Sequence, residues 1–228
     1  MKQAIKWFCA LLLLCAFVGL TYATTHVDVR PIGPQSTQVG LSALNEKIFE
    51  LCGIEKNENG TVLNERFYQL TEMLGYASIA VCAGFGVLGL IQWITRRGLK
   101  KVDRTIFCLA GLYIVTIALY VIFNKLVVIN YRPLIMAGET MPEPSFPSSH
   151  SMLVMVVMGS TVMVLREYVE STPARVLLRI ICILVLLAML VLRLLSGAHW
   201  PSDIAAGCVM GGMLIFLFSA VRNGSGKN

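Results

Sequence analysis

Charged side chains are scarce in this sequence. Asp, Glu, Lys and Arg make up 14% of the 228 residues, whereas 56% of the residues are hydrophobic. Soluble domains carry about 25% charged residues, so this chain has too little polar surface to cover a globule in water. The shortage excludes an ordinary soluble protein and indicates an integral membrane protein.

Paired cysteine motifs are also missing. The chain has seven cysteines, an odd number, and none of them stands in a Cys-x-x-Cys spacing. All except Cys52 lie in apolar stretches. This pattern argues against a disulfide framework and against a zinc site, and it is typical of buried small hydrophobic side chains.

Six apolar runs are present that can cross a bilayer, for which about 20 mostly apolar residues are needed. The charge-free runs cover residues 7–26, 73–95, 105–124, 144–165, 180–192 and 204–221. The fifth run is short, but Arg179 can extend to the interface and Arg193 can face the interior, so we extend it to 176–196. The sequence therefore predicts an all-α integral membrane protein, a single domain over residues 1–228 folded as a six-transmembrane-helix bundle.

The first apolar run has two interpretations. Lys2 and Lys6 followed by residues 7–23 also resemble a secretory signal peptide, and we favour an uncleaved anchor that forms the first span. Residues 24–72 then form an outer loop, in which segments 43–52 and 62–74 have apolar residues at helical spacing and are predicted to be short amphipathic helices. Residues 73–221 are predicted to form the catalytic part of the protein, which consists of five helices.

Orientation follows from the basic residues, which accumulate on the cytoplasmic side of short loops. If the N-terminus is inside, most of the 19 Lys and Arg residues fall on inner segments, which predicts that both termini are cytoplasmic. These basic residues are spread over four inner segments and form no continuous patch, so nucleic acid is not an expected partner.

Tryptophan and glycine residues add two smaller predictions. Trp7, Trp93 and Trp200 lie near predicted interfaces, as in an aromatic belt. Gly207, Gly211 and Gly212 lie in the last span, where glycine allows close helix packing.

Three clusters of ionisable residues lie next to the predicted spans, where such groups are costly and functional by default. They read KLVVINYRP at 125–133, PSSH at 147–150 and RLLSGAHWPSD at 193–203. In the predicted topology the third and fifth spans end on the outer side, and the fourth and sixth spans begin there. All three clusters can therefore meet in one outer pocket.

The cations of these clusters suit a phosphoryl group. Transfer of that group requires mainly positioning and neutralisation of its oxygens, which Lys125, Arg132 and Arg193 can provide. The N-termini of the fourth and sixth spans add unpaired N–H groups that favour an anion. The clusters thus predict a phosphate pocket.

The two histidines differ in their sequence neighbours. Asp203 stands four residues after His199 and can orient one ring nitrogen, which leaves the other nitrogen free as a nucleophile. His150 has no such neighbour and is predicted to act as the general acid that protonates the leaving oxygen. This arrangement predicts a covalent phosphohistidine that water then hydrolyses.

A metal-dependent mechanism would need several carboxylates or histidines around the ions. The acids that we place near the outer pocket are Glu139, Glu143 and Asp203. We therefore expect metal-independent chemistry and no cofactor.

In order and spacing, the three clusters resemble the signature of the lipid phosphate phosphatases, K-x6-RP, PSGH and SR-x5-H-x3-D. These enzymes form the type 2 phosphatidic acid phosphatase branch of a superfamily that also contains bacterial acid phosphatases and vanadium haloperoxidases. The resemblance implies their membrane fold. The site residues that it implies are His199, His150 and Asp203 for catalysis and Lys125, Arg132, Ser148, Ser149 and Arg193 for phosphate binding, with no metal ligand.

The sequence departs from that signature at two positions. Ser149 stands where the pattern has Gly, which matters only if the backbone there needs a positive φ. Leu192 stands where the pattern has Ser, which removes a possible hydroxyl contact. Neither change affects the expected nucleophile or acid.

The expected function is hydrolysis of a lipid-linked phosphomonoester or diphosphate, either a polyprenyl diphosphate such as undecaprenyl diphosphate or a phosphatidate-type lipid. The substrate is expected from the bilayer of a bacterial plasma membrane, with the site facing outward; the sequence identifies no protein partner and leaves that question open. One alternative is a lipid phosphotransferase that uses the same histidine. Another is a noncatalytic protein that binds or transports a lipid phosphate, and a haloperoxidase has the least support.

Overall fold

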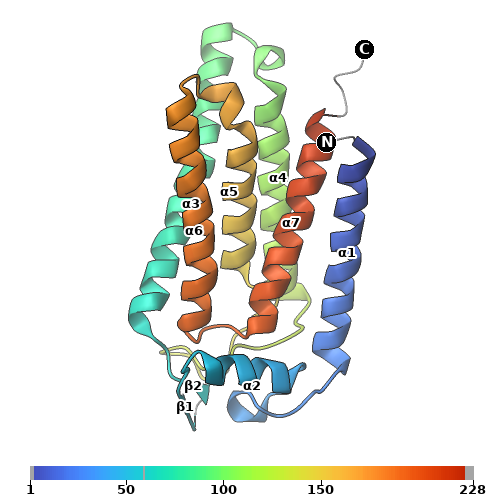
Figure 1. The fold of residues 1–228 in the computed structure, drawn as a ribbon, viewed down its shortest axis with the longest axis vertical. Coiled ribbons are helices and arrows are strands. Elements are labelled where there is room, and N and C mark those ends of the chain that lie inside the picture. The colour runs from blue at the N-terminus through green and yellow to red at the C-terminus, as the bar shows by residue number, and fades with distance from the viewer. Residues whose placement is uncertain (1–2, 59, 224–228) are drawn as a thin grey trace.

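The computed structural model describes residues 3–58 and 60–223 and shows a bundle of long helices (Figure 1). Within these residues, six helices are long and apolar enough to cross a membrane. They are α1 (Gln3–His26), α3 (Glu65–Arg96), α4 (Arg104–Val121), α5 (Ser149–Tyr168), α6 (Thr172–Leu195) and α7 (Pro201–Asn223). The prediction of an all-α membrane protein is confirmed. Lys2 and Lys227, used above for orientation, lie outside the described residues.

Helices α5 and α7 form the centre of the bundle. Most of their apolar residues are buried, whereas α1, α3, α4 and α6 keep wide apolar faces exposed, as expected for helices that contact lipid. A Cβ atom at Gly207 would lie 2.5 Å from the carbonyl oxygen of Ser148, and one at Gly211 would lie 2.8 Å from the Cβ of Met155. These distances confirm the expected close packing, since only glycine fits at both positions.

The start and the end of the described chain lie at one end of the bundle, and helix α2 (Ser42–Leu51) lies at the other, with strands β1 (Lys56–Asn57) and β2 (Gly60–Thr61) (Figure 1). Helix α1 packs along α7, and the Nζ of Lys6 donates a hydrogen bond of 3.0 Å to the carbonyl of Ser219. Residues 3–26 are therefore an integral part of the bundle.

The prediction of a second short helix at 62–74 is wrong. Most of this segment forms the first turns of α3, which runs unbroken for 32 residues from Glu65. Asn64 caps it by accepting a 3.2 Å hydrogen bond from the backbone N of Phe67. The apolar spacing of 62–74 continues in phase into the span, so nothing ends the helix between them.

Trp200 does not belong to an aromatic belt. It is 1% exposed, and its ring stacks on Phe49 of α2 with a centroid distance of 5.2 Å. Its Nε1 donates to the carbonyl of Tyr131 over 2.9 Å. Helix α2 therefore packs its apolar face onto the loop that precedes α7, whereas Trp7 and Trp93 are about half exposed.

The same helix caps α7. The Oδ1 of Asn45 accepts from the backbone N of Ser202 over 3.1 Å, and its Nδ2 donates to the hydroxyl of Ser202 over 3.1 Å. Asn45 is fully buried, so water does not replace these bonds if the side chain is removed. The segment before the span thereby fixes the start of α7.

Replacing this cap is expected to destabilise the protein. Asn45→Ala leaves a buried N–H of α7 unpaired, which costs about 1–2 kcal/mol of unfolding free energy. Thermal unfolding of the purified protein in detergent measures the change. Lys47→Ala, on the exposed side of α2, is the control, and equal melting temperatures for the two variants would refute the role of the cap.

Candidate active site

Four helix ends meet at the end of the bundle that carries α2 (Figure 1). Residues 125–133 follow α4, residues 147–150 open α5, and residues 193–203 run from the last turn of α6 into α7. The structure therefore places the three sequence clusters at one end of the bundle, as the predicted topology requires.

Arg193 lies at the centre of this site and is fully buried. Its Nη1 donates to the hydroxyl of Thr71 over 2.8 Å and to Oε1 of Glu72 over 3.2 Å. Its Nη2 lies 3.3 Å from Nδ1 of His150 and 3.3 Å from Nε2 of His199. Because both nitrogens lie 3.3 Å from the same Nη2, Nδ1 of His150 and Nε2 of His199 are close enough for one phosphoryl group to contact both.

These contacts also assign the protons of the two rings. A guanidinium group can only donate, so Nε2 of His199 and Nδ1 of His150 accept from Arg193 and carry lone pairs. The proton of His199 is then on Nδ1. The proton of His150 is on Nε2, which lies 3.2 Å from Oε1 of Glu72.

His199 is held in its neutral form. Burial lowers the pKa of this imidazole well below its usual range, and the guanidinium groups of Arg132 and Arg193 lower it further. Below that pKa the ring would be protonated, so at neutral pH it is unprotonated at Nε2. The nitrogen that faces Arg193 is therefore available as a nucleophile.

Asp203 faces the expected nitrogen of His199 but does not bond to it. Its Oδ2 lies 3.8 Å from Nδ1 of His199, which is beyond hydrogen-bond distance. The carboxylate accepts from Nδ2 of Asn130 over 3.1 Å and from the backbone N of Trp200 over 3.3 Å, and the carbonyl of Asp203 accepts from the backbone N of Ser148 over 2.9 Å. Asp203 therefore ties the three clusters together.

Two arginines of the site have buried donor atoms without a partner. Nη1 of Arg132 and Nε of Arg193 make no hydrogen bond with the described residues, although Nε of Arg132 lies 3.0 Å from Oε2 of Glu143. Buried donors are rarely left unpaired in a native structure. The oxygens of a phosphoryl group would satisfy them.

The N-terminus of α5 is open toward an anion. The hydroxyl of Ser148, the residue before the helix, accepts from the hydroxyl of Ser151 over 3.0 Å and makes no capping hydrogen bond. Ser149 is the first residue of the helix and is not among the residues with positive φ, so serine suits the position where the family signature has glycine. The first N–H groups of α5 can therefore add to a phosphate site.

The expectation of a second open helix N-terminus is wrong. The first turn of α7 is capped by Asn45 of α2, and the carboxylate of Asp203 occupies its inner side. An anion finds no free N–H of Ser202 there.

Lys125 forms no bond to the other site residues that the structure describes. It lies on the short π-helical turn Ile122–Leu126 that follows α4, where its side chain is exposed. It makes no ion pair or hydrogen bond with any residue that the structure describes. Of the three predicted phosphate-binding cations, Arg132 and Arg193 flank the histidines.

Glu72 was not among the predicted site residues, because the predicted outer loop extended to residue 72. With α3 beginning at Glu65, Glu72 lies in the second turn of a membrane helix, where an ionisable group is functional by default. An earlier start of that span would have selected it. Asn130 carried no comparable signal, because its partner Asp203 is 73 residues away in sequence.

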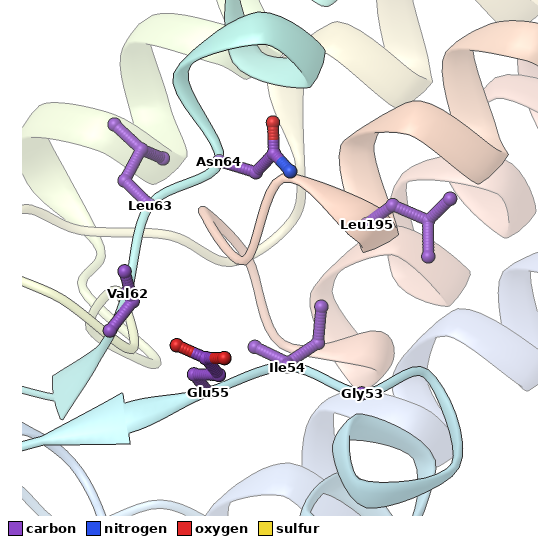
Figure 2. Close-up of a pocket in the computed structure, with 7 residues that line it drawn as sticks. All are labelled: Gly53, Ile54, Glu55, Val62, Leu63, Asn64 and Leu195. Atoms are coloured by element: carbon purple, nitrogen blue, oxygen red, sulfur yellow. The ribbon is translucent and has the colours of Figure 1, made fainter.

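A pocket of about 270 Å³ lies beside the site rather than in it. Figure 2 shows that it is lined by residues 53–55, residues 62–64 and Leu195 at the end of α6. None of the predicted site residues lines it. The backbone N of Asn64 donates to the carbonyl of Ser196 over 3.1 Å, so this pocket belongs to the wall that supports the loop before His199.

Comparisons with known proteins define the class of this membrane protein. The model of the PAP2 superfamily matches residues 104–227, more than half of the sequence. The chain therefore belongs to the PAP2 superfamily, which confirms the resemblance seen in the three clusters and supports a lipid phosphatase at the level of the family.

A solved structure has the same fold. It is the crystal structure of the first transmembrane PAP2 type phosphatidylglycerolphosphate phosphatase from Bacillus subtilis, with a TM-score of 0.62 and 13% sequence identity. The match covers 96% of this chain and 98% of that chain. A search of curated proteins found no match.

Proposed function

We propose that this protein hydrolyses a lipid-linked phosphomonoester or diphosphate through a phosphohistidine on His199, without a metal ion. One observation carries the proposal: Nε2 of His199 and Nδ1 of His150 lie 3.3 Å from the same guanidinium nitrogen of buried Arg193. A nucleophile and an acid are thereby held around one oxyanion site.

Binding depends on donors that the protein already holds in place. The phosphoryl oxygens accept from Nη1 of Arg132, Nε of Arg193 and the first N–H groups of α5. These groups are buried or helix-bound before the substrate arrives, so little reorganisation accompanies the reaction. Ser149 contributes through its backbone N–H at this helix start, Ser148 contributes through its hydroxyl, and Lys125 is a further phosphate-binding cation.

The first half of the reaction forms the phosphoenzyme. The lone pair on Nε2 of His199 attacks phosphorus, and the bond between phosphorus and the leaving oxygen breaks with its electron pair on that oxygen. When the phosphate displaces Nδ1 of His150 from its contact with Arg193, this nitrogen takes up a second proton from water. The doubly protonated ring then donates that proton to the leaving oxygen. Asp203 faces the imidazolium character that develops on His199.

The second half restores the enzyme. Water loses a proton to Nδ1 of His150 and attacks phosphorus, and the bond between phosphorus and Nε2 breaks with its electron pair returned to His199. Inorganic phosphate leaves, Nδ1 of His150 returns its proton to water, and both histidines have regained their starting protonation. No group other than water is consumed.

The substrate and the orientation are part of the proposal. A polyprenyl diphosphate, such as undecaprenyl diphosphate, or a phosphatidate-type lipid can keep its tail in the bilayer while its head reaches His199. Basic residues gather between α3 and α4, at the opposite end from the site, as expected for a cytoplasmic side. We therefore propose an outward-facing site, cytoplasmic termini and a bacterial plasma membrane.

Phosphate release from a panel of lipids tests the function. Purified protein in detergent is given phosphatidate, phosphatidylglycerol phosphate and prenyl diphosphates, and inorganic phosphate is measured in water alone. Release from at least one lipid supports the hydrolase. Release only when an acceptor lipid or sugar is added would indicate a phosphotransferase, and binding without release would indicate a noncatalytic protein; either result refutes the proposal.

Chelation of metal ions is expected to leave the activity nearly unchanged, whereas vanadate is expected to inhibit it. Activity on the best lipid should stay within about twofold in excess EDTA, because Arg132 and Arg193 provide the positive charge. Orthovanadate should inhibit strongly, because it copies the geometry of the phosphoryl transition state. Initial rates measure both effects, and a loss of activity in EDTA that magnesium restores would contradict the mechanism.

A further inference from the structure

Glu72 reaches the site from a helix that carries none of the three clusters. Its Oε1 lies 3.2 Å from Nε2 of His150 and 3.2 Å from Nη1 of Arg193. Glu72 is on α3, outside the residues 104–227 that match the family model. The carboxylate thus binds the nitrogen of His150 that faces away from the phosphoryl position.

Gly75 completes the surface against which His150 packs. It is buried on α3, three residues after Glu72 and therefore on the same face of the helix. A Cβ atom at this position would lie 3.1 Å from Cδ2 of His150, so even alanine would press on the ring and shift it slightly. Helix α3 therefore holds His150 at one edge through Glu72 and leaves room for the ring at Gly75.

The chemistry of His150 requires such a partner. To act as a general acid it must carry a second proton, and the nearby charges of Arg132 and Arg193 oppose that proton by repulsion. A carboxylate on Nε2 favours the doubly protonated ring and directs Nδ1 toward the leaving oxygen. This is the support that sequence reasoning assigned to Asp203 for His199, where the observed distance is 3.8 Å.

We propose that Glu72 is the positioning residue of His150 and supports its action as the general acid; this inference rests on the proposed function. In the step concerned, the Nδ1 proton of His150 goes to the leaving oxygen as the bond between phosphorus and oxygen breaks with its pair on that oxygen. The Nε2 proton stays in the hydrogen bond with Glu72. Glu72 itself gains and loses no atom.

A purely structural role for Glu72 predicts a different outcome. If Glu72 only balances the charge of Arg193, its removal weakens phosphate binding equally for every substrate. If it supports the acid, its removal matters only when the leaving oxygen needs a proton. Two substrates with unequal leaving groups separate these roles.

The experiment compares Glu72→Gln with the wild-type protein on two substrates. The first is an alkyl phosphate, short-chain phosphatidate, whose alkoxide must be protonated as it leaves. The second is p-nitrophenyl phosphate, whose phenolate leaves without a proton. We expect kcat/KM to fall about 100-fold for the alkyl phosphate and less than about fivefold for the aryl phosphate, since general acid catalysis contributes about 10²–10⁴-fold.

Three further variants control this comparison. Glu65→Gln removes an exposed carboxylate from the first turn of the same helix and should leave both rates unchanged. Glu72→Asp keeps the charge and should recover part of the loss on the alkyl phosphate. Gly75→Ala displaces the ring of His150 without changing any charge, and should show the same preference for the aryl phosphate.

The outcomes are distinguishable. Equal losses on both substrates in Glu72→Gln, with an unchanged melting temperature, would overturn the inference and leave the proposed function standing. If Glu72→Gln fails to fold, Glu72→Asp decides the question by the same comparison, since equal losses on both substrates would overturn the inference. An inactive wild-type protein on every phosphate tested would refute the proposed function itself.

Discussion

His199→Ala is expected to lower phosphate release by roughly 10⁴-fold or more, because removal of a nucleophile eliminates the covalent route. The ring is buried and neutral, and its Nε2 is one of two nitrogens that face Arg193. The remaining donors would still bind the phosphoryl group. We therefore expect KM to change much less than kcat, as measured on the best lipid of the panel.

The chain offers a matched control for this variant. His26, at the end of α1, is exposed and stacks on Tyr22 at 4.5 Å, so His26→Ala should retain full activity. Rapid quenching with a radiolabelled substrate should trap acid-labile phosphate on the wild-type protein and none on His199→Ala. If radiolabelled phosphate were also trapped on His199→Ala, the covalent intermediate would form on another residue, and the mechanism would be excluded.

Arg193→Lys is expected to lower kcat/KM by about 10²–10³-fold, the usual cost of losing an oxyanion donor. Lysine keeps the charge, but its single ammonium group cannot contact Thr71, Glu72 and both histidines at once. Arg193→Ala should in addition lower the unfolding free energy by about 1–3 kcal/mol, because the hydrogen bonds of Arg193 to Thr71 and Glu72 are lost. Steady-state kinetics and thermal unfolding in detergent measure the two effects.

Arg179→Lys is the matched control for Arg193→Lys. Arg179 lies on the same helix, α6, and is exposed, so the exchange should change neither activity nor melting temperature. If Arg193→Lys were as active as the wild type, the geometry of the guanidinium group would be irrelevant. The contacts of Arg193 with the two histidines would then not be needed for catalysis.

The membrane helices could be predicted from the sequence because lipid imposes a simple requirement, a long run without charge. The requirement identifies the existence of a span better than its ends. The first turns of α3 contain Glu65, Arg66 and Glu72, and charge counting therefore placed the span eight residues too late at Met73. The helix begins at Glu65 because the side chain of Asn64 caps it, through a local hydrogen bond that hydropathy does not report.

The site residues also fall into two groups, those that the sequence identifies and those that only the fold reveals. Arg193, His150 and His199 could be selected because their clusters stand at span ends and follow the spacing of a known signature. Asn45 could not, since its partner Ser202 is 157 residues away. Glu72, whose partner His150 is 78 residues away, was overlooked because its segment was predicted to lie outside the span. Only the packing of α2 and α3 against the later helices brings them into contact.

The capping of α7 by α2 has a consequence for how the protein can be divided. The signature residues all lie in the C-terminal portion, yet the turn that presents His199 is clamped by Phe49 and Asn45, which precede it by some 150 positions. A fragment restricted to residues 104–227 would keep every residue of the signature. It would lose helix α2, which supports the turn that carries the nucleophile. Grafting this chemistry onto another membrane scaffold would require transferring that helix together with the signature.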